Sequence, residues 1–164
     1  METSRKSISR RLACVCAFAL TGLLANGCAA LRNARHPDPL TSAERLNLGV
    51  TYEQEGKLDL ALREYQRAER GSMASMALAY QGNIHSASER IPEAKKKYRA
   101  ALKANPDNIM ALNNLAWLLA QEPESLDEAE RLIRHALALD PHPREPCENT
   151  LDLILENRLK TAPE

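Results

Sequence analysis

The chain has 164 residues, of which 44% are hydrophobic and 4% aromatic, with a single tryptophan. This composition favours one modest domain and argues against a large compact core. Its 22 basic and 22 acidic side chains cancel to a net charge of zero. Because phosphate binding needs a concentrated basic surface, this balance speaks against a nucleic-acid partner.

The N-terminus has the pattern of an export signal. Residues 1–11 are polar and basic, and residues 12–24 form a run of 13 residues that is apolar except for Thr21 and Gly22. A basic segment followed by a short apolar segment is typical of a secretory signal, and the run is too short to span a bilayer as a helix. We therefore expect this end of the chain to direct export.

The sequence Leu24-Ala25-Asn26-Gly27-Cys28 resembles a bacterial lipoprotein box. This resemblance implies a signal peptide over residues 1–27 and a mature chain that begins at Cys28 and carries diacylglycerol on its thiol. The protein would then be a lipoprotein of the bacterial envelope, and Ala29 favours the outer membrane, facing the periplasm. Cleavage by the ordinary signal peptidase and an uncleaved anchor are the alternatives.

Residues 28–40 are expected to form a flexible tether, since Pro37 and Pro39 cannot continue a helix. Fully extended, this segment would reach about 40 Å. Cys14 and Cys16 fall within the predicted signal, and Cys28 would be blocked by lipid. Only Cys147 would remain, so no intramolecular disulfide is expected in the mature chain.

Three copies of a helix-turn-helix pattern follow the tether. Each copy carries two small residues that flank an aromatic or branched one, and the copies are spaced 33 and then 35 residues apart: Ala61, Tyr65 and Ala68; Ala94, Tyr98 and Ala101; Ala129, Ile133 and Ala136. A period near 34 predicts an all-α helical solenoid. The pattern resembles that of tetratricopeptide repeat (TPR) proteins. The resemblance implies a TPR domain over residues 41–164, with repeats at about 42–74, 75–108 and 109–143.

Helix-start signals recur along these repeats. Thr41 and Glu44 predict a capping box before a helix that ends near Gln54, and Ser125 and Glu128 predict another. The most apolar run after the signal is 111–120, the expected centre of the solenoid. Residues 145–160 are predicted to form a capping helix that covers the last hydrophobic face, or alternatively the first helix of a broken fourth repeat.

The TPR resemblance also implies a binding groove lined by the first helix of each repeat. Positions two, five, nine and thirteen of each unit contact peptides in this family. Here they are Ala43, Leu46, Val50 and Gln54; Met76, Ala79, Asn83 and Ala87; Met110, Asn113, Trp117 and Gln121. None is charged, so the Lys and Arg clamp that chaperone-type members use for a C-terminal carboxylate is missing. Trp117 lies at the groove's edge, where simple core packing is an equal alternative.

No phosphate loop, paired-histidine metal motif or nucleophile signature is present, so neither an enzyme, a cofactor nor a metal is expected. Cys147, with His142, His135 and Asp140 nearby in sequence, is the only thiol to consider, and an idle buried cysteine is the simpler interpretation. His85 is interpreted as a packing residue. The lysines of 95–103 are interpreted as a solvated outer face.

These features predict a non-catalytic adaptor that is held at the membrane by lipid and binds a peptide or helix of a protein partner, with no small-molecule substrate. Its general plan is similar to that of pilotin lipoproteins, which guide the assembly of secretins or type IV pili. Two alternatives remain open: a regulatory subunit of an envelope peptidase or cell-wall hydrolase, and a structural protein that self-associates through its C-terminal helix.

Overall fold

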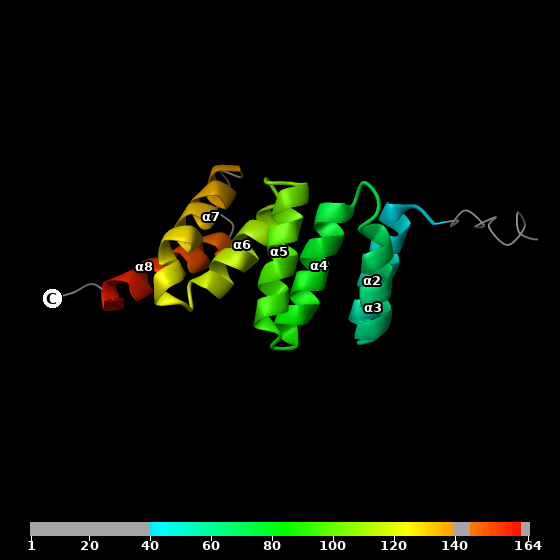
Figure 1. Cartoon of the computed structure of the whole chain (residues 1–164), viewed down its shortest axis with the longest axis horizontal. Helices are drawn as coiled ribbons and strands as arrows, with labels where there is room; N and C mark the ends of the chain where they lie inside the picture. The colour runs from blue at the N-terminus through cyan, green and yellow to red at the C-terminus, as the bar shows by residue number, and fades with distance from the viewer. Residues whose placement is uncertain (1–39, 140–144, 162–164) are drawn as a thin grey trace, which may run out of the picture. The chain divides into compact units, whose positions relative to one another are not determined.

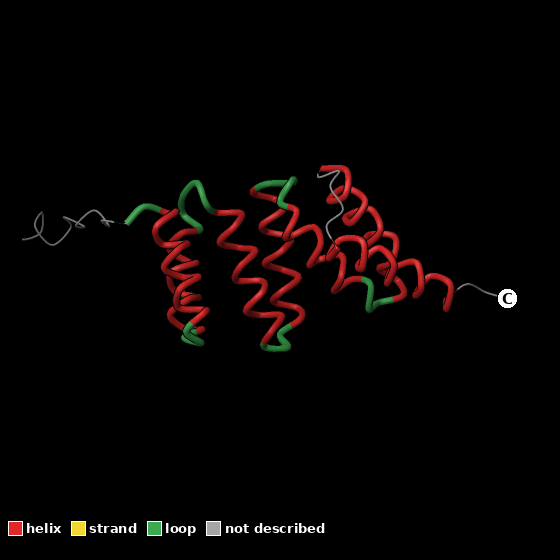
Figure 2. The backbone as a smooth tube through the Cα atoms, turned by 180° about the vertical axis from the view of Figure 1, so that it is seen from behind, coloured by secondary structure: helices red, strands yellow, loops and turns green. Residues whose placement is uncertain are grey.

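The computed structural model describes residues 40–139 and 145–161. The predicted signal peptide, the lipidation residue Cys28 and the tether up to residue 39 lie outside this range. The described chain folds into α2 (Ser42–Gln54), α3 (Leu58–Ala68), α4 (Ala74–Ala87), α5 (Ile91–Ala104), α6 (Ile109–Leu119), the 3-10 helix η1 (Pro123–Ser125), α7 (Leu126–Leu139) and α8 (Glu145–Thr161). Figures 1 and 2 show helices joined by short loops and no strand in this part of the chain.

The helices pack as successive pairs, α2 with α3, α4 with α5 and α6 with α7. The second helix of each pair also packs against the next helix along the chain: α3 against α4, α5 against α6, and α7 against α8. Figure 1 shows this order from the cyan end of the domain to the red α8. Such nearest-neighbour stacking is what defines a helical solenoid, so the predicted fold class is confirmed.

Glycine allows close packing within the first two pairs. A Cβ atom at Gly82 would lie 2.5 Å from Cε1 of Tyr98, and one at Gly49 would lie 2.4 Å from Cε1 of Tyr65. Both tyrosine rings are buried and fill the space that a side chain would take. Glycine weakens a helix, but here it lets the partner helix approach.

Local capping fixes where the helices begin. The predicted capping box at Thr41 is present, with the Glu44 amide donating to Thr41 Oγ1 at 3.2 Å and the Thr41 amide donating to Glu44 Oε2 at 2.7 Å. The box predicted for Ser125 and Glu128 is wrong. Ser125 belongs to η1 and lies 3.3 Å from Glu122, while Glu128 accepts from Arg99, because the extra residue of this repeat forms a 3-10 turn before α7.

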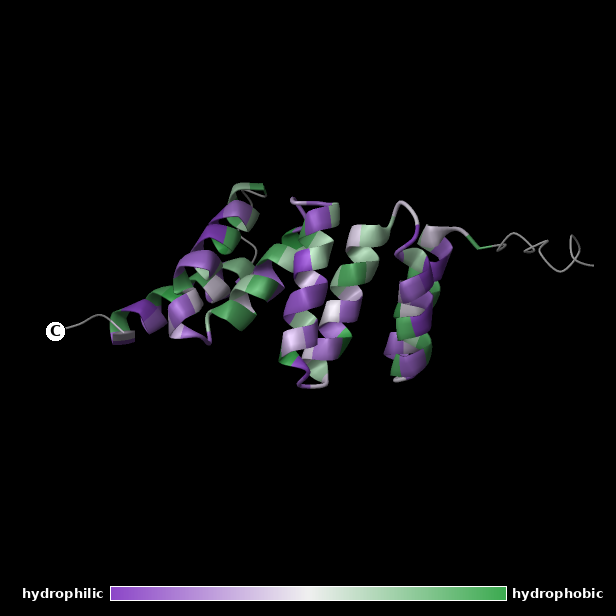
Figure 3. Ribbon diagram, viewed as in Figure 1, coloured by the Kyte–Doolittle hydropathy of each residue, from purple (hydrophilic) through white to green (hydrophobic). Residues whose placement is uncertain are grey.

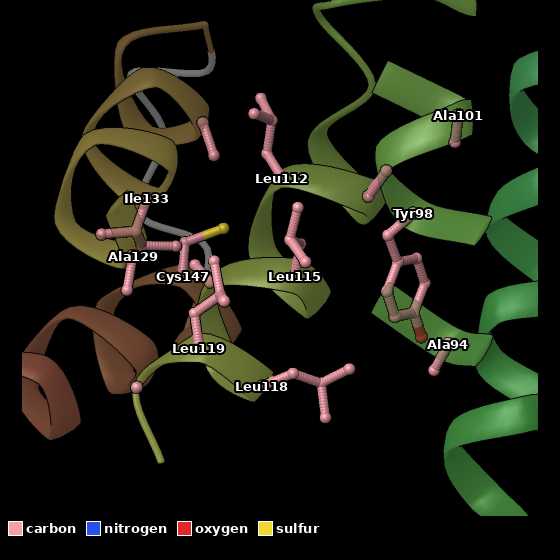
Figure 4. Close-up of a cluster of buried hydrophobic side chains, with 14 of the residues drawn as sticks. Ala94, Tyr98, Ala101, Leu112, Leu115, Leu118, Leu119, Ala129, Ile133 and Cys147 are labelled. Atoms are coloured by element: carbon pink, nitrogen blue, oxygen red, sulfur yellow. The ribbon is translucent and has the colours of Figure 1, made fainter. Parts of the chain in front are cut away.

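Buried apolar side chains form two clusters. The N-terminal cluster consists of Leu46, Ala61, Tyr65, Ala68, Ala77 and Ile84. The C-terminal cluster runs from Leu78 through the leucines of α6 to Cys147 and Ile154 on α8. Figure 3 shows the concentration of hydrophobic residues on α6, and Figure 4 shows the C-terminal cluster in detail. Helix α6 is therefore the centre of the larger core, as the sequence predicted.

The lysines of α5 do not form a simple solvated face. Lys97 Nζ lies 3.5 Å from Glu69 at the end of α3, and Arg99 Nη2 lies 3.2 Å from Glu128 on α7. Lys95 pairs with Glu122. These ion pairs cross from one helix pair to the next, so the interpretation of a purely solvated stripe is corrected: part of it links neighbouring repeats.

Helix α8 covers one side of α6 and α7. Cys147, Thr150 and Ile154 are buried at spacings of three and four residues. Arg158 Nη2 lies 2.7 Å from Asp127 and 2.8 Å from Glu130, both on α7. The predicted capping helix is therefore present, and its Leu155 is exposed.

Candidate functional site

The first helices of the pairs carry the predicted groove residues, with differing exposure. Leu46 is buried in the N-terminal cluster, and Val50 packs partly buried beside it, so both serve mainly as core. Gln54 and Gln121 are exposed at helix ends, and Ala43 is exposed while Ala79 is buried. Partial exposure is shared by Met76, Asn83, Met110 and Asn113. The first repeat therefore contributes less open surface to the groove than the family positions implied.

An open pocket of about 470 Å³ lies between the second and third pairs. We call it the α4–α6 pocket. Four of the family groove positions line it: Asn83, Ala87, Asn113 and Trp117. Three further lining residues are not among the family groove positions: Ser86, Tyr98 and Asn114. The structure thus gathers the second and third repeats into one site and leaves Leu46, Val50 and Gln54 away from it.

Trp117 is the most exposed large side chain of this pocket. Its relative exposure is 47%, although it lies on the most apolar helix of the domain. A tryptophan that was only a core residue would be buried with its neighbours Leu115 and Leu118. Its aromatic face is therefore available to pack against a bound apolar group.

Amide side chains form a continuous hydrogen-bond network along the pocket floor. Tyr98 Oη and Asn114 Nδ2 both donate to Asn83 Oδ1 at 2.8 Å. Asn113 Nδ2 donates to Asn114 Oδ1 at 3.1 Å, and Thr150 Oγ1 donates to Asn113 Oδ1 at 2.9 Å. The network joins α4, α5, α6 and α8. It holds the amides in defined orientations, which favours selective binding.

Tyr98 reaches the pocket from the core. Its ring is buried over Gly82, and its hydroxyl emerges beside Asn83. Burial raises the pKa of Tyr98 to about 12, a shift that the hydrogen bond with Asn114 opposes. The phenol therefore remains protonated at neutral pH and acts as a hydrogen-bond donor.

Two methionines of the predicted groove are contacted by amides. Asn83 Nδ2 lies 3.6 Å from Met110 Sδ, and Asn108 Nδ2 lies 3.8 Å from Met76 Sδ. Asn108 also caps α6 by accepting from the Ala111 amide at 3.1 Å. These contacts fix the junction between the second and third pairs beside the pocket.

The first helices of the pairs carry almost no Lys or Arg. Helices α4 and α6 contain no Lys or Arg, and the single one of α2, Arg45, is buried against Glu64. The bases of these three pairs are carried mostly by α3, α5 and α7. The α4–α6 pocket therefore lacks a cation that could neutralise a carboxylate ligand.

The thiol considered from sequence is enclosed in the core. Cys147 is buried in the C-terminal cluster with Ala129 and Ile133 (Figure 4). His135 is exposed, with Nε2 3.0 Å from Asp107, and the other two candidates, His142 and Asp140, lie outside the described residues. Within residues 40–139 and 145–161, no three His, Cys, Asp or Glu side chains are grouped so that they could hold a metal ion.

His85 lies on α4 among packed side chains. Burial lowers its pKa, as do the positive charges of Arg90 and Lys97, while Glu93 opposes them. Its Nδ1 has no hydrogen-bond partner among the described residues. This environment suits a neutral packing residue.

None of the helices in the described ranges is long and apolar enough to cross a membrane.

Comparisons with known proteins agree with this architecture. Residues 81–143 match the tetratricopeptide repeat family model. No curated protein matches the sequence. Among solved structures, the first TPR of Spaghetti (RPAP3), bound to the HSP90 peptide SRMEEVD, is 18% identical with a TM-score of 0.62, covering 75% of this chain and 97% of that one.

Two further structures show the same fold. The second TPR domain of human RPAP3, in complex with the HSP70 peptide SGPTIEEVD, is 18% identical with a TM-score of 0.59, covering 70% of this chain and 94% of that one. A tetratricopeptide repeat protein from Parabacteroides merdae is 23% identical with a TM-score of 0.63, covering 80% of this chain and 51% of that one. The described chain thus has the fold of a TPR solenoid, and its residues 81–143 carry the family's sequence pattern.

Proposed function

We propose that this protein is a non-catalytic adaptor that binds a segment of a protein partner in the α4–α6 pocket. The observation that carries the proposal is an exposed tryptophan, Trp117, above a floor of ordered amides in an open pocket of about 470 Å³. Pockets that combine an apolar surface with a few fixed polar groups are suited to binding.

The pocket chemistry favours an uncharged peptide segment. Each primary amide nitrogen carries two hydrogens, and the network uses one from Asn113 and one from Asn114. The remaining N–H groups can donate to backbone carbonyls of an extended peptide, while Trp117 packs against an apolar side chain. The related TPR structures hold peptides ending in EEVD. Without a cation in this pocket, we expect such acidic peptides to bind poorly.

Lipid attachment at Cys28 would complete the adaptor. The lipoprotein-like sequence before Cys28 and the two prolines of residues 28–40 support an anchor at the outer membrane with a short tether. Confining the pocket to a membrane surface raises the effective concentration of a membrane-associated partner. A role similar to that of pilotins, in secretin or type IV pilus assembly, fits this plan.

Trp117 supplies its own assay, because it is the only tryptophan of the chain. Photo-crosslinking from position 117 in intact cells is expected to capture a defined partner, and crosslinking from the exposed Leu60 on α3 serves as the control. A fragment of that partner should change Trp117 fluorescence on titration, whereas the peptide SGPTIEEVD should not. The same captured proteins at both positions, or a response to SGPTIEEVD alone, would contradict the proposal.

The anchor is tested separately. The intact mass of protein extracted from membranes should correspond to a chain that starts at Cys28 with added acyl groups, and the Cys28→Ser variant should lack this mass. An unmodified chain that retains Met1 would refute the envelope location and leave the pocket assay unaffected.

A further inference from the structure

Helix α8 has a side that no described element covers. Its buried residues Cys147, Thr150 and Ile154 face α6 and α7. The opposite side carries residues at spacings of three and four, which places them in one row along the helix: Glu145, Glu148, Asp152, Leu155 and Leu159. All five are exposed, Leu155 by 39% and Leu159 by 80%. We call this row the outer face of α8.

The position of α8 in the array explains why its outer face is open. Helices α2, α4 and α6 each pack against the second helix of their own pair, and α4 and α6 also pack against the helix before them. Helix α8 follows α7 as the first helix of a next pair would, and among the described elements it packs only against α6, η1 and α7. Its outer face is therefore free on the side away from α6 and α7.

The charges on this face have one sign. Three carboxylates, those of Glu145, Glu148 and Asp152, precede the leucines along the row, and none forms an ion pair with a residue that the structure describes. The two bases of α8 are directed elsewhere: Arg158 to Asp127 and Glu130, and Lys160 to Glu156 at 2.8 Å. The outer face thus combines two exposed leucines with three carboxylates that have no ion-pair partner among the described residues.

From this complementarity we infer that the outer face of α8 docks a cationic amphipathic helix of a partner protein. The helix would cover Leu155 and Leu159 with apolar residues and place Lys or Arg beside the three carboxylates.

A second copy of this chain fits the face less well. Its own α8 offers no unpaired base to the three carboxylates, because Arg158 is paired with Asp127 and Glu130 and Lys160 with Glu156. Because this surface lies apart from the α4–α6 pocket, it can be present or absent independently of the proposed adaptor function.

The experiment uses the chain from Cys28 to its end, with Cys28→Ser, and two fluorescein-labelled helical peptides. One peptide consists of leucine and lysine with the leucines on one face, and the other replaces every lysine by glutamate. Fluorescence anisotropy should show binding of the leucine-lysine peptide only. The pairs Leu155→Ser/Leu159→Ser and Glu148→Gln/Asp152→Asn should each weaken binding by about tenfold, from lost apolar burial and lost charge pairing respectively.

Matched controls remove equivalent groups elsewhere. Leu60→Ser replaces an exposed leucine on α3, and Asp59→Asn/Glu93→Gln removes two exposed first-turn acids from α3 and α5. Both should change affinity by less than about twofold, because exposed charges beyond a Debye length are screened. Circular dichroism melts should coincide for all variants, since every replaced side chain is exposed.

Three results would overturn the inference. If Asp59→Asn/Glu93→Gln weakened peptide binding as much as Glu148→Gln/Asp152→Asn, the attraction would be non-specific. Loss of peptide binding in Trp117→Ala alone would assign the peptide to the α4–α6 pocket. Light scattering that detects a dimer abolished by Leu155→Ser/Leu159→Ser would show that a second copy occupies this face.

Discussion

The two ends of the domain are stabilised by different kinds of contact. The N-terminal cluster contains six buried apolar residues, whereas the C-terminal cluster contains eighteen and is rich in leucine. Polar pairs compensate in the N-terminal part. Arg45 Nη1 lies 2.5 Å from Glu64 Oε2 with both side chains buried, and Tyr65 Oη donates to Glu53 at 2.6 Å while its ring stacks on Tyr80. Sequences with the same repeat pattern can thus fill equivalent positions with either apolar or ionic pairs.

The largest effect should come from the leucine core. Leu115→Ala is expected to lower the free energy of unfolding by about 4 kcal/mol, because the cavity would form at the centre of the larger cluster. Leu46→Ala, at the edge of the smaller cluster, should cost about 2 kcal/mol. Urea unfolding followed by circular dichroism measures both. Equal losses would show that the two clusters are equivalent, contrary to this comparison.

The ionic pair offers a sharper test. Arg45→Met should cost about 3 kcal/mol, because Glu64 would remain buried with only the exposed Arg67 as partner. Adding Glu64→Leu should recover most of this loss, since a buried ion pair can be replaced by apolar groups of similar volume. Urea midpoints of the two single variants and the double variant complete the cycle. A double variant less stable than either single one would show that the pair itself stabilises the repeat.

The smallest effect should be the pH dependence of the unfolding free energy that arises from His85. This residue lies on α4, between the two ends of the domain. Its pKa is lowered in the folded protein, so the unfolded chain binds a proton at higher pH than the folded chain does. The stability that neutral His85 contributes is fully present above the unfolded pKa of about 6.5 and falls as the pH drops below it. His85→Phe should reduce the loss of unfolding free energy between about pH 7.5 and pH 5.5. Identical slopes in wild type and His85→Phe would exclude the effect.

The repeat pattern was sufficient to predict the fold because its signals are local. The spacing of Ala61, Ala94 and Ala129 marks tightly packed second helices, and Thr41 with Glu44 marks the start of the first helix. The ionic pair of Arg45 with Glu64 could not be predicted in this way. Its partners lie 19 residues apart, and only the packing of α2 on α3 brings them together.

The pocket was predicted in part for a similar reason. Family positions pointed to Asn83, Asn113 and Trp117, but they also included Leu46, which is buried in the N-terminal cluster. Tyr98 was recognised only as part of the repeat pattern, yet its buried ring places its hydroxyl in the pocket. The adjacent Asn113 and Asn114 were an available signal, since they are the only polar residues of α6 and paired amides in an apolar helix need partners.

The amide network has a direction. Thr150, whose hydroxyl also lies 2.9 Å from the Pro146 carbonyl, donates to Asn113, Asn113 donates to Asn114, and Asn114 donates to Asn83. These three bonds all run from the C-terminal helix toward the second pair. Rotating one amide by half a turn would set donor against donor on one side and acceptor against acceptor on the other. The orientations of Asn113 and Asn114 are therefore tied to that of Asn83, because an amide that turned alone would lose its bonds to its neighbours.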